Sequence, residues 1–145
     1  DNLSVQLAQC CFPLPGDVIV AITDKIKGTL VHKINCSELT FERNTKNWRD
    51  VYWKGESAKD QYHLGRINVI IAHEPGSLGV LANIIGKKSG NIANLLITER
   101  SKLFYEMIFD IQVRDLSHLM EIISSIKPIP SVNYVGRDQH GNLLN

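Results

Sequence analysis

Three features are missing from this sequence of 145 residues, and each absence excludes a class of protein. The charge is nearly balanced, with 16 Lys and Arg, 15 Asp and Glu and a net charge of +1. This excludes nucleic-acid binding by bulk positive charge. No apolar run approaches the roughly 18 residues of a membrane span, so no membrane partner is expected. Neither an initiator methionine nor a signal peptide is present, so we expect residue 1 to lie inside a longer cytoplasmic protein.

Cysteine is scarce as well. The three cysteines are Cys10, Cys11 and Cys36, and an odd number without a signal peptide argues against the disulfide framework of a secreted domain. We therefore expect reduced thiols or metal ligands.

The clearest pattern in the chain is a strand, a glycine turn, a helix and a second strand over residues 67–92. Pro75 and Gly76 interrupt an apolar run, and Gly90 is predicted to end the following helix by adopting a positive φ. The buried helix face is predicted from apolar residues with i, i+3, i+4, i+7 spacing: Leu78, Leu81, Ala82 and Ile85.

The rest of the second half extends this pattern. Strands are predicted at 63–72, 91–98, 103–113 and 131–136, and helices at 77–89 and around the apolar set Leu116, Leu119, Met120 and Ile123. The order βαββαβ predicts a ferredoxin-like domain over residues 61–145, with two helices on one face of a four-stranded antiparallel sheet.

The first half, residues 1–60, is predicted to be a separate β-rich unit that carries the cysteines. A turn at 13–17 precedes a hairpin of strands 17–23 and 29–34, then a short helix at 35–43 and a strand at 48–53 with Val51 and Trp53 on one side. Residues 55–61 are interpreted as a linker. The predicted fold class is therefore α+β.

The motifs in these two units resemble those of a known family. The segment Glu74–Ala82, with the ending Gly90-Asn91-Ile92, resembles an ACT domain. The first unit is similar to the conserved-cysteine zinc-finger domain of the RelA/SpoT family, in the segments Cys10–Asp17, Lys27-Gly28 and Val31–Cys36. The segment Val51-Tyr52-Trp53 resembles the short strand that precedes the ACT domain in that family, so the resemblance covers nearly the whole chain.

This resemblance implies a bacterial regulatory fragment. The parent would be a (p)ppGpp synthetase or hydrolase of the stringent response, with catalytic domains N-terminal to Asp1. In the family this end contacts the ribosome, senses deacylated tRNA in some members and controls the catalytic half. No residue here resembles the family's catalytic motifs, so the fragment itself is not expected to be an enzyme. Asn35 stands where the family usually has Asp.

Cys10, Cys11, His32 and Cys36 are the candidate metal ligands. Three thiolates and one imidazole suit a tetrahedral, structural Zn²⁺ site. The residues alone leave open the alternative of small apolar cysteines in a core, and the adjacent Cys10 and Cys11 would face opposite ways in a strand. The resemblance favours zinc.

The candidate ligand-binding residues lie at the glycine turn and at the start of the next strand: Glu74, Gly76, Ser77, Leu78, Gly79, Asn91 and Ile92. The backbone N–H groups of the turn would bind the carboxylate of an amino acid, Asn91 its ammonium group and Leu78 and Ile92 its side chain. Valine or isoleucine would fit such a wall. Alternatively, the glycines serve only the turn and the packing of helix on sheet.

Two broader hypotheses remain. The first is the regulatory module just described, and the alternative is an amino-acid-binding ACT domain of an enzyme of amino-acid metabolism. ACT domains often pair through their sheet edges, and the strand at 91–98 carries few charges to prevent this, so a homodimer is predicted.

Overall fold

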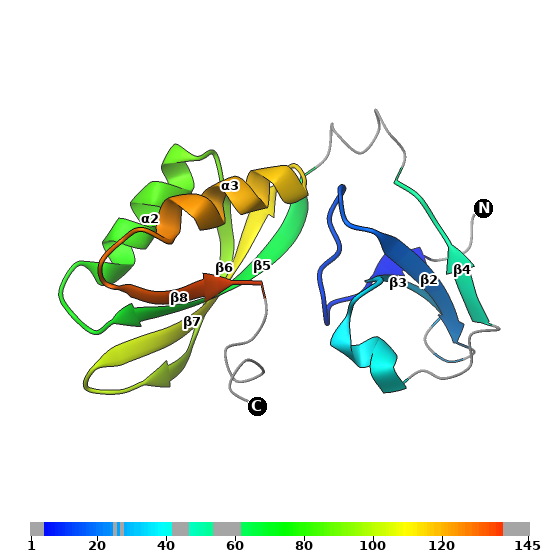
Figure 1. The fold of residues 1–145 in the computed structure, drawn as a ribbon, viewed down its shortest axis with the longest axis horizontal. Coiled ribbons are helices and arrows are strands. Elements are labelled where there is room, and N and C mark those ends of the chain that lie inside the picture. Colours follow the sequence, from blue (N-terminus) through cyan, green and yellow to red (C-terminus); the bar gives the residue numbers. More distant parts are fainter. Residues whose placement is uncertain (1–4, 25, 27, 42–46, 54–61, 138–145) are drawn as a thin grey trace. The chain divides into compact units, whose positions relative to one another are not determined.

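The computed structural model describes residues 5–24, 26, 28–41, 47–53 and 62–137 (Figure 1). The chain divides into two compact units, residues 1–61 and residues 62–145. The predicted linker at 55–61 lies outside the described residues. Among the described residues, no helix is long and apolar enough to cross a membrane.

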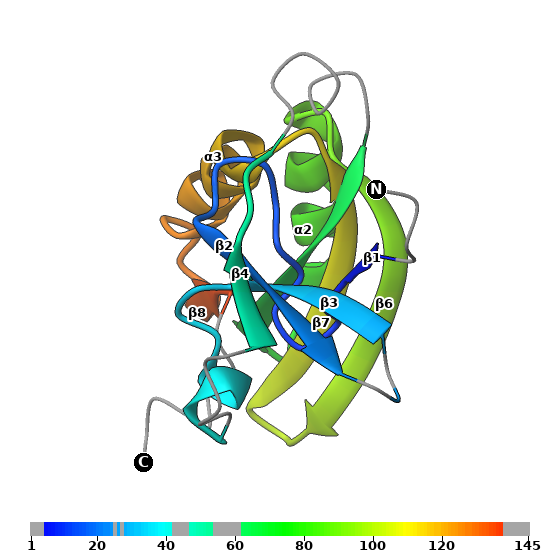
Figure 2. The same ribbon diagram turned by 90° about the vertical axis from the view of Figure 1, so that its right-hand side faces the viewer.

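The first unit is built on a four-stranded sheet. Its strands are β1 (Val5–Leu7), β2 (Ile19–Asp24), β3 (Gly28–Lys33) and β4 (Trp48–Asp50), in the order β1-β3-β2-β4. The hairpin of β2 and β3 is antiparallel as predicted, and Figure 2 shows these strands with β4 beside β2. β1 pairs with β3 in parallel. The predicted helix at 35–43 is a short 3₁₀ helix, η1 (Ser37–Phe41).

Both faces of this small sheet are covered, because alternate residues of β2 point to opposite sides. Val20 and Ile22 pack in one cluster with Leu39 and Cys36, and Trp48 packs against it. The other face holds a second cluster, Ile19, Ala21 and Val31, against which Val51 and Trp53 pack. The prediction that Val51 and Trp53 share one side is confirmed.

The second unit has the predicted βαββαβ order. Its sheet, β6-β7-β5-β8, is antiparallel throughout, and α2 and α3 lie together on one face of it (Figure 1). The elements are β5 (His63–Ala72), α2 (Ser77–Lys87), β6 (Asn91–Arg100), β7 (Phe104–Val113), α3 (Leu116–Ile126) and β8 (Val132–Gly136).

The core of the second unit lies between the helices and the sheet. Alternate residues of β5 and β7 point toward the helices, because side chains alternate along a strand. The fully buried side chains include Ile67, Ile71, Leu81, Ile85, Phe109, Ile111, Leu119, Ile122 and Ile126. The side chain of Asp115 caps α3 by accepting a hydrogen bond from the His118 amide at 2.8 Å.

The predicted helix faces were partly wrong. In α2 the buried residues are Ser77, Leu81 and Ile85, an i, i+4, i+8 stripe, while Leu78 is 40% exposed and Ala82 is exposed. In α3, Met120 is 43% exposed. The buried i, i+4, i+8 stripe of α2 is therefore narrower than the predicted i, i+3, i+4, i+7 face.

The prediction that Gly90 ends α2 by adopting a positive φ is also wrong. The residue that adopts the positive φ after α2 is Ser89, at 66°, and Gly90 is not among the residues with positive φ. A Cβ at Gly90 would lie 2.9 Å from side-chain atoms of Ile85, Ile111 and Ile122. Gly90 is therefore required by close packing of the chain against the core.

Candidate functional site

Local turns bring the three cysteines and one histidine of the first unit together. β1 continues past Leu7, since the Ala8 amide donates to the Val31 carbonyl at 2.9 Å. A turn then follows, closed by the Phe12 amide on the Ala8 carbonyl at 3.1 Å, and Phe12 has a φ of 48°. Because Cys10 and Cys11 lie in this turn and not in a strand, both sulfurs reach the same side.

The other two residues come from β3 and the turn after it. His32 lies in β3 and is 9% exposed, and Cys36 follows a turn in which its amide donates to the Lys33 carbonyl at 3.0 Å. The Sγ of Cys10 is 3.4 Å from both His32 Nδ1 and Cys36 Sγ. The ligand atoms of Cys10, Cys11, His32 and Cys36 all lie within 4.8 Å of one another, close enough to hold one metal ion.

Two thiols of this cluster, Cys10 and Cys11, have raised pKa values. Burial, with a smaller effect of the hydrogen bond to Cys36, raises the pKa of Cys10 to about 11. Burial also raises the pKa of Cys11, against the opposing effect of the Lys33 amide. A metal ion bound here would therefore have to displace these protons.

Supporting contacts hold the cluster in place. The Lys33 amide donates to Cys11 Sγ at 3.3 Å. In the loop that leaves the cysteines, the Leu14 amide donates to the Asp17 carboxylate at 2.7 Å, and Trp53 Nε1 donates to the Asp17 carbonyl at 3.1 Å. The sequence did not indicate these three hydrogen bonds, although the Pro-x-Pro-Gly-Asp turn signal marked the position of Asp17.

The glycine turn of the second unit opens α2 as predicted. Gly76 is the N-cap residue with a φ of 84°, and the helix has no side-chain cap. The Ser77 hydroxyl is buried and donates to the Ala72 carbonyl at 2.8 Å, so it orders the turn and is not available to a ligand as a donor. Glu74 and Gly79 are exposed, like Leu78.

The two halves of the predicted ligand site lie at opposite ends of the sheet. Asn91 pairs with Gln112, which pairs with Leu64 at the start of β5, whereas the turn follows Ala72 at its end. The intervening stretch of β5 is roughly 26 Å long at about 3.3 Å per residue. The Asn91 side chain donates to Gln112 Oε1 at 3.0 Å, and Ile92 is half-buried. One copy of the chain therefore does not bring all seven residues together.

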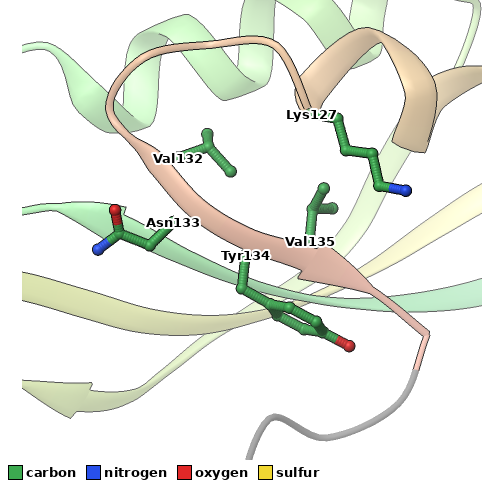
Figure 3. Close-up of a pocket in the computed structure, with 5 residues that line it drawn as sticks. All are labelled: Lys127, Val132, Asn133, Tyr134 and Val135. Atoms are coloured by element: carbon green, nitrogen blue, oxygen red, sulfur yellow. The ribbon is translucent and has the colours of Figure 1, made fainter.

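A cavity that was not predicted lies beside the edge strand β8. It has a volume of about 250 Å³ and is lined by Lys127 and by residues 132–135 of β8. Figure 3 shows Lys127 at the end of α3, with Val132 and Val135 on one side of the strand and Tyr134 on the other. No sequence motif marked this position.

Two family models match the chain. Residues 1–54 match the RelA/SpoT RIS domain, and residues 59–137 match the ACT domain. The metal-binding candidates lie in the first match and the glycine turn in the second. The solved structures that resemble the chain include the crystal structure of the ACT domain from GTP pyrophosphokinase of Chlorobium tepidum, with a TM-score of 0.47 at 17% identity, over 53% of this chain and 99% of that chain.

Curated relatives match both units together. GTP pyrophosphokinase rsh of Brucella ovis is 35% identical over 125 residues, which cover 86% of this chain and 17% of the relative. The bifunctional (p)ppGpp synthase/hydrolase SpoT of Escherichia coli is 28% identical over 141 residues, covering 97% of this chain and 20% of the relative. The chain thus spans about a fifth of the length of the curated relatives it matches.

Proposed function

The chain belongs to the ACT-domain family and carries a RelA/SpoT RIS domain before its ACT domain, and from this premise we propose that it regulates a (p)ppGpp synthetase or hydrolase. The observation that carries this proposal is the order of the two domains on one chain, with similarity to the same relatives running through both. An ACT domain of an amino-acid enzyme, joined to an unrelated first unit, would not produce such a match. The proposed partners in the same protein are the synthetase and hydrolase domains.

An exchange experiment tests this proposal. The matching part of Brucella ovis GTP pyrophosphokinase rsh is replaced by this chain, and (p)ppGpp is measured in cells before and during amino-acid starvation. We expect the chimera to respond to starvation more like the intact enzyme than like an enzyme truncated before this part. A chimera indistinguishable from the truncated enzyme would contradict the regulatory role.

We further propose that Cys10, Cys11, His32 and Cys36 hold a structural Zn²⁺. Thiolate and imidazole are the ligands that zinc prefers, and a tetrahedral site with Zn–S bonds of about 2.3 Å separates its sulfurs by about 3.8 Å. The separations of 3.4 Å between Cys10 and Cys36 Sγ and 4.0 Å between Cys10 and Cys11 Sγ bracket that value. The Lys33 amide would continue to support Cys11 as a thiolate.

Metal analysis of the purified chain tests the zinc proposal. We expect about one zinc per chain, and Cys36→Ser should lower both the zinc content and the stability of the first unit. The control is Glu38→Gln, which changes an exposed residue near Cys36 and leaves the four ligands intact. Full stability of the first unit after metal removal by a chelator would contradict a structural role.

Ribosome and tRNA contacts are proposed on the family resemblance alone. The near-zero net charge means that such contacts would depend on local groups and not on bulk charge. Co-sedimentation of the chain with bacterial ribosomes, with and without deacylated tRNA, tests the proposal. Absence of the chain from the ribosome pellet at low salt would count against it.

The glycine turn is proposed to bind the carboxylate of valine or isoleucine, with a second copy of the chain completing the site. The first amides of a helix lack partners within the helix, and this suits a carboxylate. Since Asn91 and Ile92 lie at the far end of the sheet, they would reach the turn only from a second copy. The site therefore requires the predicted homodimer.

Calorimetry and light scattering test these two points together. Gly76→Val should abolish binding, because a β-branched residue is strained at a φ of 84°. Gly86→Ala is the control, since Gly86 lies outside the predicted ligand site and a Cβ there meets no atom within 4 Å. A monomer at high concentration, or no heat with any amino acid at millimolar concentration, would leave the glycines with only their structural role.

A further inference from the structure

Two sulfur atoms in the cysteine cluster are close together but differ in exposure. Cys10 is exposed, whereas Cys36 is buried, with 6% of its surface accessible. Their Sγ atoms are 3.4 Å apart and come from segments that follow β1 and β3. A disulfide needs about 2.0 Å between the sulfurs, so the two atoms would have to approach by about 1.4 Å.

Cys11 is a poorer partner for Cys10. The Cα atoms of neighbouring residues are about 3.8 Å apart, below the roughly 4.4 Å at which disulfides usually begin. The Sγ atoms of Cys10 and Cys11 are 4.0 Å apart, and the Lys33 amide holds Cys11 Sγ at 3.3 Å. The geometry thus selects Cys36 as the thiol that would react with a modified Cys10.

We propose that Cys10 is a site of oxidation by peroxides and that Cys36 converts the oxidised Cys10 into an intrachain disulfide. In the first step the Cys10 thiol loses its proton, its sulfur attacks one oxygen of the peroxide, the O–O bond breaks and Cys10 becomes a sulfenic acid. Because burial raises the pKa of Cys10 to about 11, little thiolate is present in the metal-free chain and we expect this step to be slow there. In the second step the Cys36 sulfur attacks that sulfur, the S–O bond breaks and the S–S bond forms. With hydrogen peroxide, two thiols lose two electrons and two protons, and two water molecules are released.

The disulfide changes what the cluster can bind but keeps the strands joined. It removes two of the four proposed zinc ligands and leaves Cys11 and His32, too few for a tetrahedral site. It also connects the same two segments, after β1 and after β3, that the metal would connect. Peroxide is therefore expected to release zinc without unfolding the sheet. This last consequence rests on the proposed zinc site, whereas the disulfide itself does not.

The test uses the whole chain, both zinc-loaded and metal-free, with hydrogen peroxide as the probe. After treatment the remaining thiols are alkylated, and the chain is cleaved with trypsin. Cleavage after Lys25 and Lys33 puts Cys36 on one peptide and the other two cysteines on another, so a linked pair is recognised by its mass. We expect a link from Cys10 to Cys36 within one chain, loss of one zinc per disulfide, and recovery of the thiols with dithiothreitol.

Two variants identify the sulfurs. Cys11→Ser should still form the disulfide with Cys36, and Cys36→Ser should stop at a sulfenic acid on Cys10 that dimedone traps. If either variant fails to fold, fragmentation of the linked wild-type peptide between Cys10 and Cys11 still shows which of these two cysteines is bonded to Cys36. A Cys10–Cys11 link, a Cys11–Cys36 link, a link between chains, or three alkylatable thiols after excess peroxide would overturn the proposal. A disulfide in a chain that never binds zinc would support it while refuting the zinc site.

Discussion

Replacing Gly90 by alanine is expected to destabilise the second unit by overpacking its core. The added Cβ would lie 2.9 Å from Ile85 Cγ2, Ile111 Cγ2 and Ile122 Cδ1, closer than carbon atoms pack. These three side chains are fully buried, so they have no empty space into which to move. Overpacking of this kind costs about 1–3 kcal/mol, which lowers Tm by roughly 4–8 °C per kcal/mol in a domain of this size.

Gly86→Ala is the matched control for the same change. A Cβ at Gly86 meets nothing within 4 Å, and Gly86 lies inside α2, where alanine is favoured over glycine by about 1 kcal/mol. Urea and thermal unfolding followed by circular dichroism should therefore show opposite shifts for the two variants. The steric explanation fails if Gly90→Ala is as stable as the native chain.

A second variant tests the contact with Ile122. Ile122→Val removes the Cδ1 atom that the new methyl group would meet, and alone it should cost about 0.5–1.5 kcal/mol. Combined with Gly90→Ala, it should give a smaller loss than the sum of the two single changes. Strict additivity would mean that the contact with Ile122 does not contribute to the cost, which would leave the contacts with Ile85 and Ile111 and the backbone.

Three further predictions concern the second unit, each measured as a change in the free energy of unfolding. Ser89→Gly should stabilise it by up to about 1 kcal/mol, because the φ of 66° suits glycine; a loss of stability would contradict this. His118→Ala should cost roughly 2–4 kcal/mol, because the buried ring accepts a hydrogen bond from the Arg114 amide at 3.0 Å and contacts the Lys88 carbonyl at 2.7 Å. A cost below 1 kcal/mol would show that neither contact matters for stability. Asp110→Ala should cost roughly 1–3 kcal/mol, because it removes the carboxylate to which the partly exposed Arg66 donates at 2.7 and 3.0 Å. An unchanged stability would contradict the importance of this ion pair.

The strands and helices of the second unit were predictable because their periodicity is strong. The alternation of β7 and the apolar run of β5 gave their extents to within a residue, and the element order determined the architecture. The exact helix faces were not predictable, because apolar residues such as Leu78 and Met120 are common on surfaces. The role of Gly90 was missed because a close approach of chain segments leaves no local sequence signal.

The cysteine cluster was predictable in its residues but not in its construction. Spacing alone left open how adjacent cysteines could reach one point, and a turn closed from Phe12 to Ala8 provides the answer. The parallel pairing of β1 with β3 could not be predicted, since it joins segments more than 20 residues apart. For the ligand site, the sequence placed Asn91 and the glycine turn in one motif, but the helix between them carries the chain to the other end of the sheet.

The two units depend on different forces, and this bears on how such a chain could respond to its surroundings. The second unit buries two helices against a four-stranded sheet, so its stability depends on apolar packing that varies little with small solutes. In the first unit, β1 has three residues, all of them exposed, and its attachment to β3 continues directly into the cysteine turn. A strand that buries so little needs another source of stability, and the cluster after it is suited to a metal ion or a disulfide. The attachment of β1 is thus the part of the fold that metal and oxidant concentrations could alter while the packing of the second unit stays the same.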